Sequence, residues 1–284
     1  MKFATFLHHI AGSDIARVAR RAEELGFESL WIPDHLVLPV EYRSRYPYSH
    51  DGRMPAPPDT PRHDPFLALA YAAAVTSRIR LATGVFVLPL RNVFATAKAV
   101  ATLDVLSGGR FIFGVGIGWL EEEFQTVGMN FADRARRTRE YLAMMKELWT
   151  RSDPVFEGRS VRVEGCKFMP KPIQQPRPPV VFGGHTEPSL RRAAQLGDGW
   201  YGIAENLADM RDLIARLRGH ERAQNRSTPL EITLSPRLGA PLTAELVGTF
   251  AQMGVSRLLI PGERDAESAI TGMEQFHGQV MSRT

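Results

Sequence analysis

Two adjacent residues, Asp34 and His35, stand where a short apolar stretch ends, and they are the strongest acid–base candidates in the chain. The stretch is ESLWIPDH, residues 28–35, and its pattern is typical of a buried strand. Histidine has an ordinary pKa of about 6.5, so it can take up and release a proton near neutral pH. We therefore predict that Asp34 and His35 take part in proton transfer. A structural histidine bonded to a neighbouring loop is the alternative.

A second pair, His8 and His9, follows the first apolar stretch of the chain. Adjacent side chains on an extended strand point to opposite sides, so only one of the two can line a pocket, and we assign His9 to a substrate pocket. Trp119 and Trp200 also follow predicted strands and are expected to border this pocket, with a place in the core as the alternative. The histidines lack the H-x-H spacing and the carboxylates of a metal site, so no metal is predicted.

The stretch RFIFGVGIGW, residues 110–119, carries glycine at positions 114, 116 and 118. Glycine weakens a strand, because it costs backbone entropy and packs no side chain. Either the strand bends sharply here or a flat ligand lies against its backbone, and our hypothesis is that a ligand ring does. The G-x-G-x-x-G motif of dinucleotide-binding folds is excluded, since Trp119 stands where the third glycine belongs.

A third candidate site is the turn FGGHTEPSL, in which Gly183, Gly184, His185 and Thr186 precede a helical pattern. Backbone N–H groups before a helix start favour an anion such as phosphate. An ordinary strand-to-helix turn is the alternative.

Composition excludes several function classes. The 284 residues contain one cysteine, Cys166, which rules out an internal disulfide or a thiolate cluster. None of the five lysines stands at a predicted strand end, so no Schiff-base nucleophile is available. The net charge, 35 − 31 = +4, is spread along the chain and does not indicate nucleic-acid binding. No apolar run approaches the roughly 18 residues of a membrane span, and no cleavable signal is evident, so we expect a cytoplasmic protein.

The elements that must position these residues alternate between strand and helix. Strands are predicted at 2–7, 28–35, 79–89, 110–118, 178–184, 199–204, 230–236 and 256–262. Helices are predicted at 14–26, 64–77, 92–110, 133–149, 187–199, 206–224, 243–254 and 266–280.

Eight strand–helix units in a chain of this length predict a (β/α)8 TIM barrel, with an open doubly wound sheet as the alternative. Two segments interrupt the alternation: 39–65, after the second strand, and 153–179, before the fifth, which contains a hairpin pattern. We treat both as insertions that serve binding or assembly. No repeat or linker is evident, so we predict a single domain over residues 1–284.

Four stretches together resemble the bacterial-luciferase-like oxidoreductases, over nearly the whole chain and in the same order. They are SLWIPDH, RIRLATGVFVLPLRNVFATAKAVATLDVLSGGRFIFGVGIGWLEEEF, VVFGGHTEPSLRRAAQLGDGW and GVSRLLI. Within that superfamily the chain is most similar to the branch that uses the deazaflavin coenzyme F420, because of the form of the VVFGGHTEPSLRRAAQLGDGW stretch.

The resemblance implies roles for particular residues. Gly84 and Val85 would be joined by a cis peptide bond whose bulge backs the central ring of the cofactor, and Ile117 and Gly118 would lie beside the ring. The residues of the glycine-rich turn, Gly183, Gly184, His185 and Thr186, would hold the phosphate, and Asp34 and His35 match the Asp-His pair of the family's active site. Trp119 replaces an acidic glutamate of the family's sugar-phosphate dehydrogenases, which argues against the same substrate.

The resemblance thus implies an F420-dependent oxidoreductase that transfers a hydride to or from a small organic substrate, with the 39–65 insertion over the substrate. Three alternatives stay open: an FMN-dependent monooxygenase of the same fold, a metal-dependent barrel hydrolase using His8 or His9 with Asp34 and His35, and a cofactor-binding protein without catalysis. Family members commonly form homodimers, here through the helices at 66–77 and 93–106. The sequence names neither the substrate nor the role of oxygen.

Overall fold

Nine parallel strands form the central sheet of the computed structural model, which describes residues 1–239, 241–262 and 265–283. The sheet strands are β1 (Lys2–Phe6), β2 (Ser29–Ile32), β3 (Arg80–Thr83), β4 (Phe86–Val87), β5 (Phe111–Gly116), β8 (Val180–Gly183), β9 (Gly199–Ala204), β10 (Glu231–Pro236) and β11 (Arg257–Leu259). They lie in the order β3-β2-β1-β11-β10-β9-β8-β5-β4, and the pairing of Leu81 on β3 with Phe111 on β5 joins the two ends. The predicted barrel is confirmed. The open-sheet alternative is wrong, because this pairing leaves no gap between the ends.

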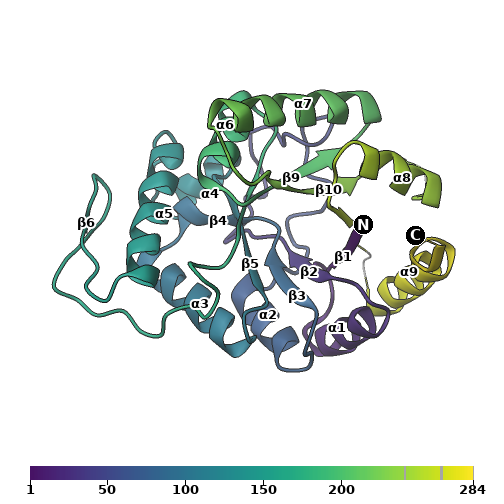
Figure 1. The fold of residues 1–284 in the computed structure, drawn as a ribbon, viewed down its shortest axis with the longest axis horizontal. Coiled ribbons are helices and arrows are strands. Elements are labelled where there is room, and N and C mark those ends of the chain that lie inside the picture. The colour runs from purple at the N-terminus through teal and green to yellow at the C-terminus, as the bar shows by residue number, and fades with distance from the viewer. Residues whose placement is uncertain (240, 263–264, 284) are drawn as a thin grey trace.

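Helices surround the strands on all sides (Figure 1). They are α1 (Ile15–Glu24), α2 (Pro65–Ala73), α3 (Val93–Leu106), α4 (Glu121–Thr126), α5 (Arg134–Thr150), α6 (Glu187–Leu196), α7 (Leu207–Ala223), α8 (Ala244–Gln252) and α9 (Ala266–Gln279). Short 3-10 turns lie at Gly12–Asp14, Leu88–Leu90 and Met281–Arg283. Six of the strand-to-helix units follow the predicted alternation directly, the unit of β2 and α2 contains the predicted insertion, and α4, between β5 and α5, was not predicted.

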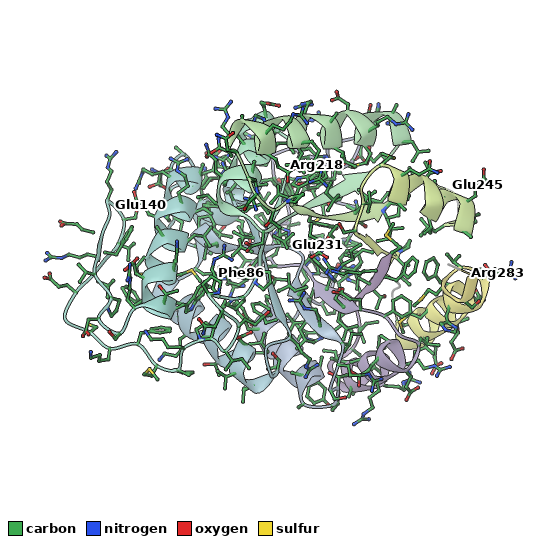
Figure 2. All side chains as sticks on the ribbon, viewed as in Figure 1. Phe86, Glu140, Arg218, Glu231, Glu245 and Arg283 are labelled. Carbon is green, nitrogen blue, oxygen red and sulfur yellow. The ribbon has the colours of Figure 1, made fainter. Side chains whose placement is uncertain are left out.

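The apolar residues divide into two layers because side chains alternate along each strand. On β5, Phe111 and Phe113 face the surrounding helices, whereas Ile112 belongs to a separate cluster with residues from the other barrel strands. That second cluster is the barrel interior, filled by Ala4, Phe6, Trp31, Ala82, Ile112, Val181, Tyr201, Ile203 and Leu259. Figure 2 shows Phe86 and Glu231 toward the middle of the view, with Glu140, Glu245 and Arg283 at the periphery.

Two long segments interrupt the alternation. Residues 33–64 run from β2 to α2 without a helix or strand, and Tyr48 in this segment packs on the barrel interior. The hairpin predicted within 153–179 is present as β6 (Phe156–Glu157) and β7 (Arg162–Val163), paired antiparallel. It projects beyond α5 at the edge of the molecule (Figure 1).

Candidate active site

The carboxyl ends of the barrel strands meet at one rim, the end at which barrel enzymes place their catalytic groups. Asp34 and His35 lie there, just after β2. The structure gives the two residues different surroundings, although they are neighbours in sequence.

Asp34 is engaged on both carboxylate oxygens. Oδ1 accepts from Nη2 of Arg91 at 2.5 Å, and Oδ2 accepts from the N–H of Val87 at 3.0 Å. The same guanidinium reaches Asp64, 3.0 Å away, whose side chain also caps the start of α2. Burial raises the pKa of Asp34, and the charge of Arg91 opposes that rise. With its side chain fully enclosed, Asp34 ties the end of β2 to β4 and α2.

His35 is paired with a glutamate that lies 88 residues away in sequence. Its Nδ1 lies 2.8 Å from Oε2 of Glu123, a residue of α4 that is 1% exposed. A carboxylate without a proton can only accept, so in that state of the pair Nδ1 of His35 is the donor to Glu123. That leaves Nε2 as the ring atom available to exchange a proton with a substrate.

The first turn of α4 also holds the segment that follows His35. Oε1 of Glu123 accepts from the N–H of Leu36 at 2.7 Å, and Oε1 of Glu122 accepts from those of Arg43 and Ser44 at 2.6 and 3.2 Å. Burial acts against ionisation, but the hydroxyl of Ser44 and these N–H groups lower the pKa of Glu122 to about 2. Helix α4 therefore orients the histidine and anchors the start of the 39–65 insertion.

The expected cis peptide bond is present between Gly84 and Val85, in the interruption between β3 and β4. Val85 packs on the barrel interior, and its side chain occupies the space beside two glycines. A Cβ at Gly116 would lie 2.7 Å from Val85, and one at Gly183 would lie 3.3 Å from it. The bulge therefore presents Val85 at the centre of the mouth.

Gly114 and Gly116 of β5, and Gly118 just after it, lie where the chain's own atoms leave no room for a side chain. A Cβ at Gly114 would lie 1.8 Å from the carbonyl oxygen of Thr83, and one at Gly118 would lie 2.6 Å from the ring of Phe124. The chain's own bulge and α4 therefore explain the missing side chains without a ligand, and a place for Gly118 beside a ligand ring stays a prediction. Gly118 also has φ of +82°, a conformation that favours glycine.

Aromatic side chains of the insertion cover the mouth next to His35. Trp119 lies edge-on to His35 at 6.2 Å between ring centroids, and it contacts Tyr42 and Tyr46 at 5.7 and 5.2 Å. Tyr48 lies edge-on to His185 at 4.9 Å, and burial raises the pKa of its hydroxyl. Trp119 thus lies between the His35–Glu123 pair and the insertion, and its role at a substrate pocket stays a prediction.

The family model described as luciferase-like monooxygenase matches residues 3–243. The chain belongs to this family. It is therefore an enzyme of the luciferase-like oxidoreductase class, as the resemblance implied.

Known proteins of the luciferase-like family cover most of the chain. An uncharacterized Mycobacterium tuberculosis protein, Rv0953c, is 32% identical over 262 residues, 92% of each chain. An F420-dependent glucose-6-phosphate dehydrogenase of Amycolatopsis mediterranei is 32% identical over 194 residues, 66% of this chain and 52% of its own length. Among solved structures, an F420-dependent secondary alcohol dehydrogenase bound to an F420–acetone adduct superposes with a TM-score of 0.78 at 17% identity, covering 100% and 99% of the two chains.

The glycine-rich turn predicted to hold phosphate lies between β8 and α6. Gly184 has φ of +111°, and Thr186 precedes α6 without capping it, since its hydroxyl bonds to Ser189 at 2.8 Å instead. Nε2 of His185 accepts the N–H of Ile203 at 3.0 Å, and burial lowers the pKa of this histidine to about 4. His185 is therefore neutral near pH 7 and cannot contribute a positive charge to an anion there.

Two other predicted pocket residues lie in contrasting places. Trp200 is fully buried in the outer core, and its Nε1 donates to the carbonyl oxygen of Gly184 at 2.9 Å. The prediction that Trp200 lines the pocket is therefore wrong, because its strand position faces the helices; the residue supports the glycine-rich turn instead. His9 lies at the mouth with φ of +66°, its ring 4.3 Å from that of His8.

Glu123 is the functional residue that sequence reasoning missed. It lies in the run EEE, where Glu121 is exposed and only the third carboxylate, next to the buried Phe124, turns inward. The only sequence signal was this position beside an apolar residue in a short acidic helix, which is too weak to identify a partner for His35. In residues 1–239, 241–262 and 265–283 no cluster of three or more potential metal ligands occurs, and no helix is long and apolar enough to cross a bilayer.

Proposed function

We propose that the protein is an F420-dependent oxidoreductase that transfers a hydride to or from a small organic substrate, with His35 as the proton-transfer group. The observation that carries this proposal is the His35–Glu123 pair at the barrel mouth, with Nδ1 held by the carboxylate and Nε2 available. Asp34 has the role of a positioning residue, because both its oxygens are committed to Arg91 and Val87.

The residues at the mouth fit a flat cofactor with a phosphate. Val85 would pack against its ring, with Ile117 and Gly118 at the side, and the turn from Gly183 to Thr186 would bind the phosphate at the start of α6. Thr186 leaves the N–H of Glu187 without a side-chain cap, whereas Pro188 has no N–H and the N–H of Ser189 donates to the carbonyl oxygen of Thr186 at 2.8 Å, so the turn itself must supply the other donors. When bound, such a cofactor supplies a ring carbon that accepts or donates a hydride.

A group of three arginines favours a cofactor with a longer anionic tail. Arg192 on α6 is 6% exposed, and none of Arg134, Arg139 and Arg192 forms an ion pair with a described residue. Burial, together with the charges of Arg139 and Arg134, lowers the pKa of Arg192. Arg134 donates to the carbonyl oxygen of Gly118, which places the group beside the mouth. F420 carries further anionic groups beyond its phosphate, whereas FMN ends at the phosphate.

The chain's own residues then perform three tasks. Nε2 of His35 takes or gives a proton at a polar atom of the substrate, and Glu123 stabilises the protonated ring. Trp119, Tyr42 and Tyr46 shield that position from water.

The second candidate is an FMN-dependent monooxygenase, favoured by the description of the family model.

Titration of the pure protein with oxidised F420 and, separately, with FMN tests the proposal. We expect F420 to bind at least ten-fold more tightly, and Arg192→Gln to weaken F420 without changing FMN affinity. Preference for FMN would overturn the proposal and direct the search to oxygen-consuming reactions.

Once an anaerobic screen of alcohols and aldehydes yields a substrate, His35→Asn is expected to lower turnover about 10²- to 10⁴-fold at unchanged F420 affinity. Unchanged turnover would show that His35 is not the proton-transfer group, whereas F420 binding without turnover of any substrate would make the protein a cofactor carrier.

We also propose that two copies associate through α2 and α3. Large apolar side chains of these helices are exposed to solvent, namely Leu67, Tyr71, Phe94, Val105 and Leu106. Leu67 is 73% exposed and Leu106 is 68% exposed, which is costly on a monomer. Light scattering after size exclusion is expected to give twice the 31.7 kDa chain mass, and Leu67→Glu with Leu106→Glu to give the monomer.

A further inference from the structure

Three basic residues, His8, Arg62 and Arg237, form a group at the barrel mouth that we call the basic cluster. His8 follows β1, Arg237 follows β10, and Arg62 belongs to the segment between β2 and α2. The charges of Arg62 and Arg237 both act on His8, and burial together with these charges and that of His9 lowers the pKa of His8 to about 3. The three side chains therefore lie close together, with His8 neutral between two cations.

Neither arginine of the basic cluster has an acidic partner within the described part of the chain. The printed polar contact of Arg62 is a long one, from Nη2 to Sδ of Met54 at 3.9 Å, and its Nε is buried without a partner. Nδ1 of His8 is likewise buried without a hydrogen-bond partner among the described residues. Burial lowers the pKa of Arg62, which is the expected cost of enclosing an unpaired guanidinium.

Glu123 is near enough to act electrostatically on Arg62, but its oxygens are already used. Oε2 holds His35, and Oε1 accepts from Leu36 and Val37 at 2.7 and 3.4 Å. The effect of the Glu123 charge on Arg62 shows that Arg62 lies near the His35–Glu123 pair. The half-buried Arg62, whose buried Nε has no partner among the described residues, and the exposed Arg237 thus bring two cations to the mouth, an arrangement suited to an anion.

We infer that the basic cluster binds an anionic group of the substrate, a carboxylate or a phosphate, and so holds the reacting carbon near His35. This inference rests on the proposed hydride-transfer function. The planar guanidinium of Arg62 matches the two oxygens of such a group. Arg134, Arg139 and Arg192 form a separate group at α5 and α6, so the anionic tail of the cofactor has its own site away from the ends of β1 and β10.

Calorimetric titration of inorganic phosphate into the F420-loaded protein tests the inference. We expect saturable binding that Arg62→Gln weakens at least ten-fold and that Arg62→Lys weakens less. Arg43→Gln is the matched control, because Arg43 is an exposed arginine of the same segment without a side-chain partner among the described residues. Melting curves and F420 titration of each variant separate loss of the site from loss of the fold.

Each outcome has a distinct meaning. Equal phosphate affinity of the wild type and Arg62→Gln, or no binding at tens of millimolar phosphate, overturns the inference. Phosphate that binds the apoprotein but is displaced by F420 assigns the basic cluster to the cofactor and also overturns it. If F420 itself does not bind, the proposed function fails; phosphate binding to the apoprotein that depends on Arg62 would then still establish the anion site.

Discussion

The two ends of the barrel differ in whether an enclosed arginine has ion-pair partners. At the end where the strands begin, Arg257 is 0% exposed and its guanidinium binds Glu28 at 2.6 and 2.8 Å, Thr233 at 2.9 Å and Glu231 at 3.2 Å. At the mouth, Arg62 has neither a carboxylate partner nor a bonded Nε among the described residues.

This difference separates stability from binding. Burial alone disfavours the charges at the first end, yet the hydrogen bonds and attraction between the partners raise the pKa of Arg257 and lower that of Glu28. Those charges are paired with one another within the chain. At the mouth Arg91 is paired with Asp34 and Asp64, whereas Arg62 has no ion-pair partner among the described residues. In a TIM barrel the former end contributes to stability and the latter to catalysis.

Removing Arg257 is expected to have the largest effect on stability. Arg257→Met leaves Glu28 and Glu231 without their buried partner and should lower the free energy of unfolding by about 3–5 kcal/mol. Denaturant titration measures this loss, with Arg20→Met on the exposed face of α1 as the control, expected to change stability by under about 0.5 kcal/mol. A loss below about 1 kcal/mol for Arg257→Met would show that this ion-pair group does not stabilise the barrel.

Lowering the pH should lower the free energy of unfolding through the buried histidines at the mouth. The folded-state pKa of His185 is about 4 against an ordinary 6.5, so below pH 6.5 only the unfolded chain takes up that proton. The stabilising contribution is complete above pH 6.5 and falls by about 1.4 kcal/mol per pH unit as the pH drops toward 4. His185→Gln should remove one histidine's part of this slope from unfolding free energies measured between pH 6.5 and 4.5, and it should leave the part due to His8, whose pKa is also lowered, to about 3. The exposed His50→Gln should leave the whole slope. An unchanged slope in His185→Gln would place the acid sensitivity elsewhere.

Glu123→Gln tests whether one carboxylate at the mouth is structural as well as functional. The amide keeps one acceptor oxygen and loses the second, so either His35 or the Leu36 N–H loses its partner. We expect the free energy of unfolding to fall by about 1–3 kcal/mol, measured in urea. Glu121→Gln, on the exposed side of the same helix, is the control. Equal stability of both variants would mean that α4 holds His35 only in the ligand-bound enzyme.

The smallest effect is expected for the unpaired arginine at the mouth. Arg62→Met keeps an apolar stem and removes a charge without a partner, so stability should stay within about 0.5 kcal/mol or increase slightly. The same denaturant titration measures it against Arg257→Met. A loss above 1 kcal/mol would mean that Arg62 is satisfied within the fold, and the contrast between the two ends would disappear.

The fold and the position of His35 were accessible from sequence because both depend on local patterns. Alternating apolar stretches predict the strand ends, and Asp34 and His35 follow the second of them. The cis bond at Gly84 and Val85 came from the resemblance alone. Its confirmation does not extend to the ligand roles of those residues, which stay predictions.

The partners of His35 and Asp34 in the candidate site could not be predicted, because they come from contacts between residues far apart in the sequence. Glu123 meets His35 across 88 residues, and Arg91 meets Asp34 across 57. The structural reason for glycine at position 114 was out of reach for the same reason: the atom that excludes a Cβ there is a backbone oxygen of Thr83, from another strand. A sequence shows that a side chain is missing but not which neighbour occupies the space.

Helix α4 holds the segment after His35 through its backbone and not through its side chains. The carboxylates of Glu122 and Glu123 hold the N–H groups of Leu36, Val37, Arg43 and Ser44, which every residue except proline supplies. The side chains of that segment can therefore be exchanged without releasing the backbone that aligns His35. Libraries that randomise positions 37 and 40 and exclude proline at 37 are expected to change what the enzyme accepts while His35 keeps its position.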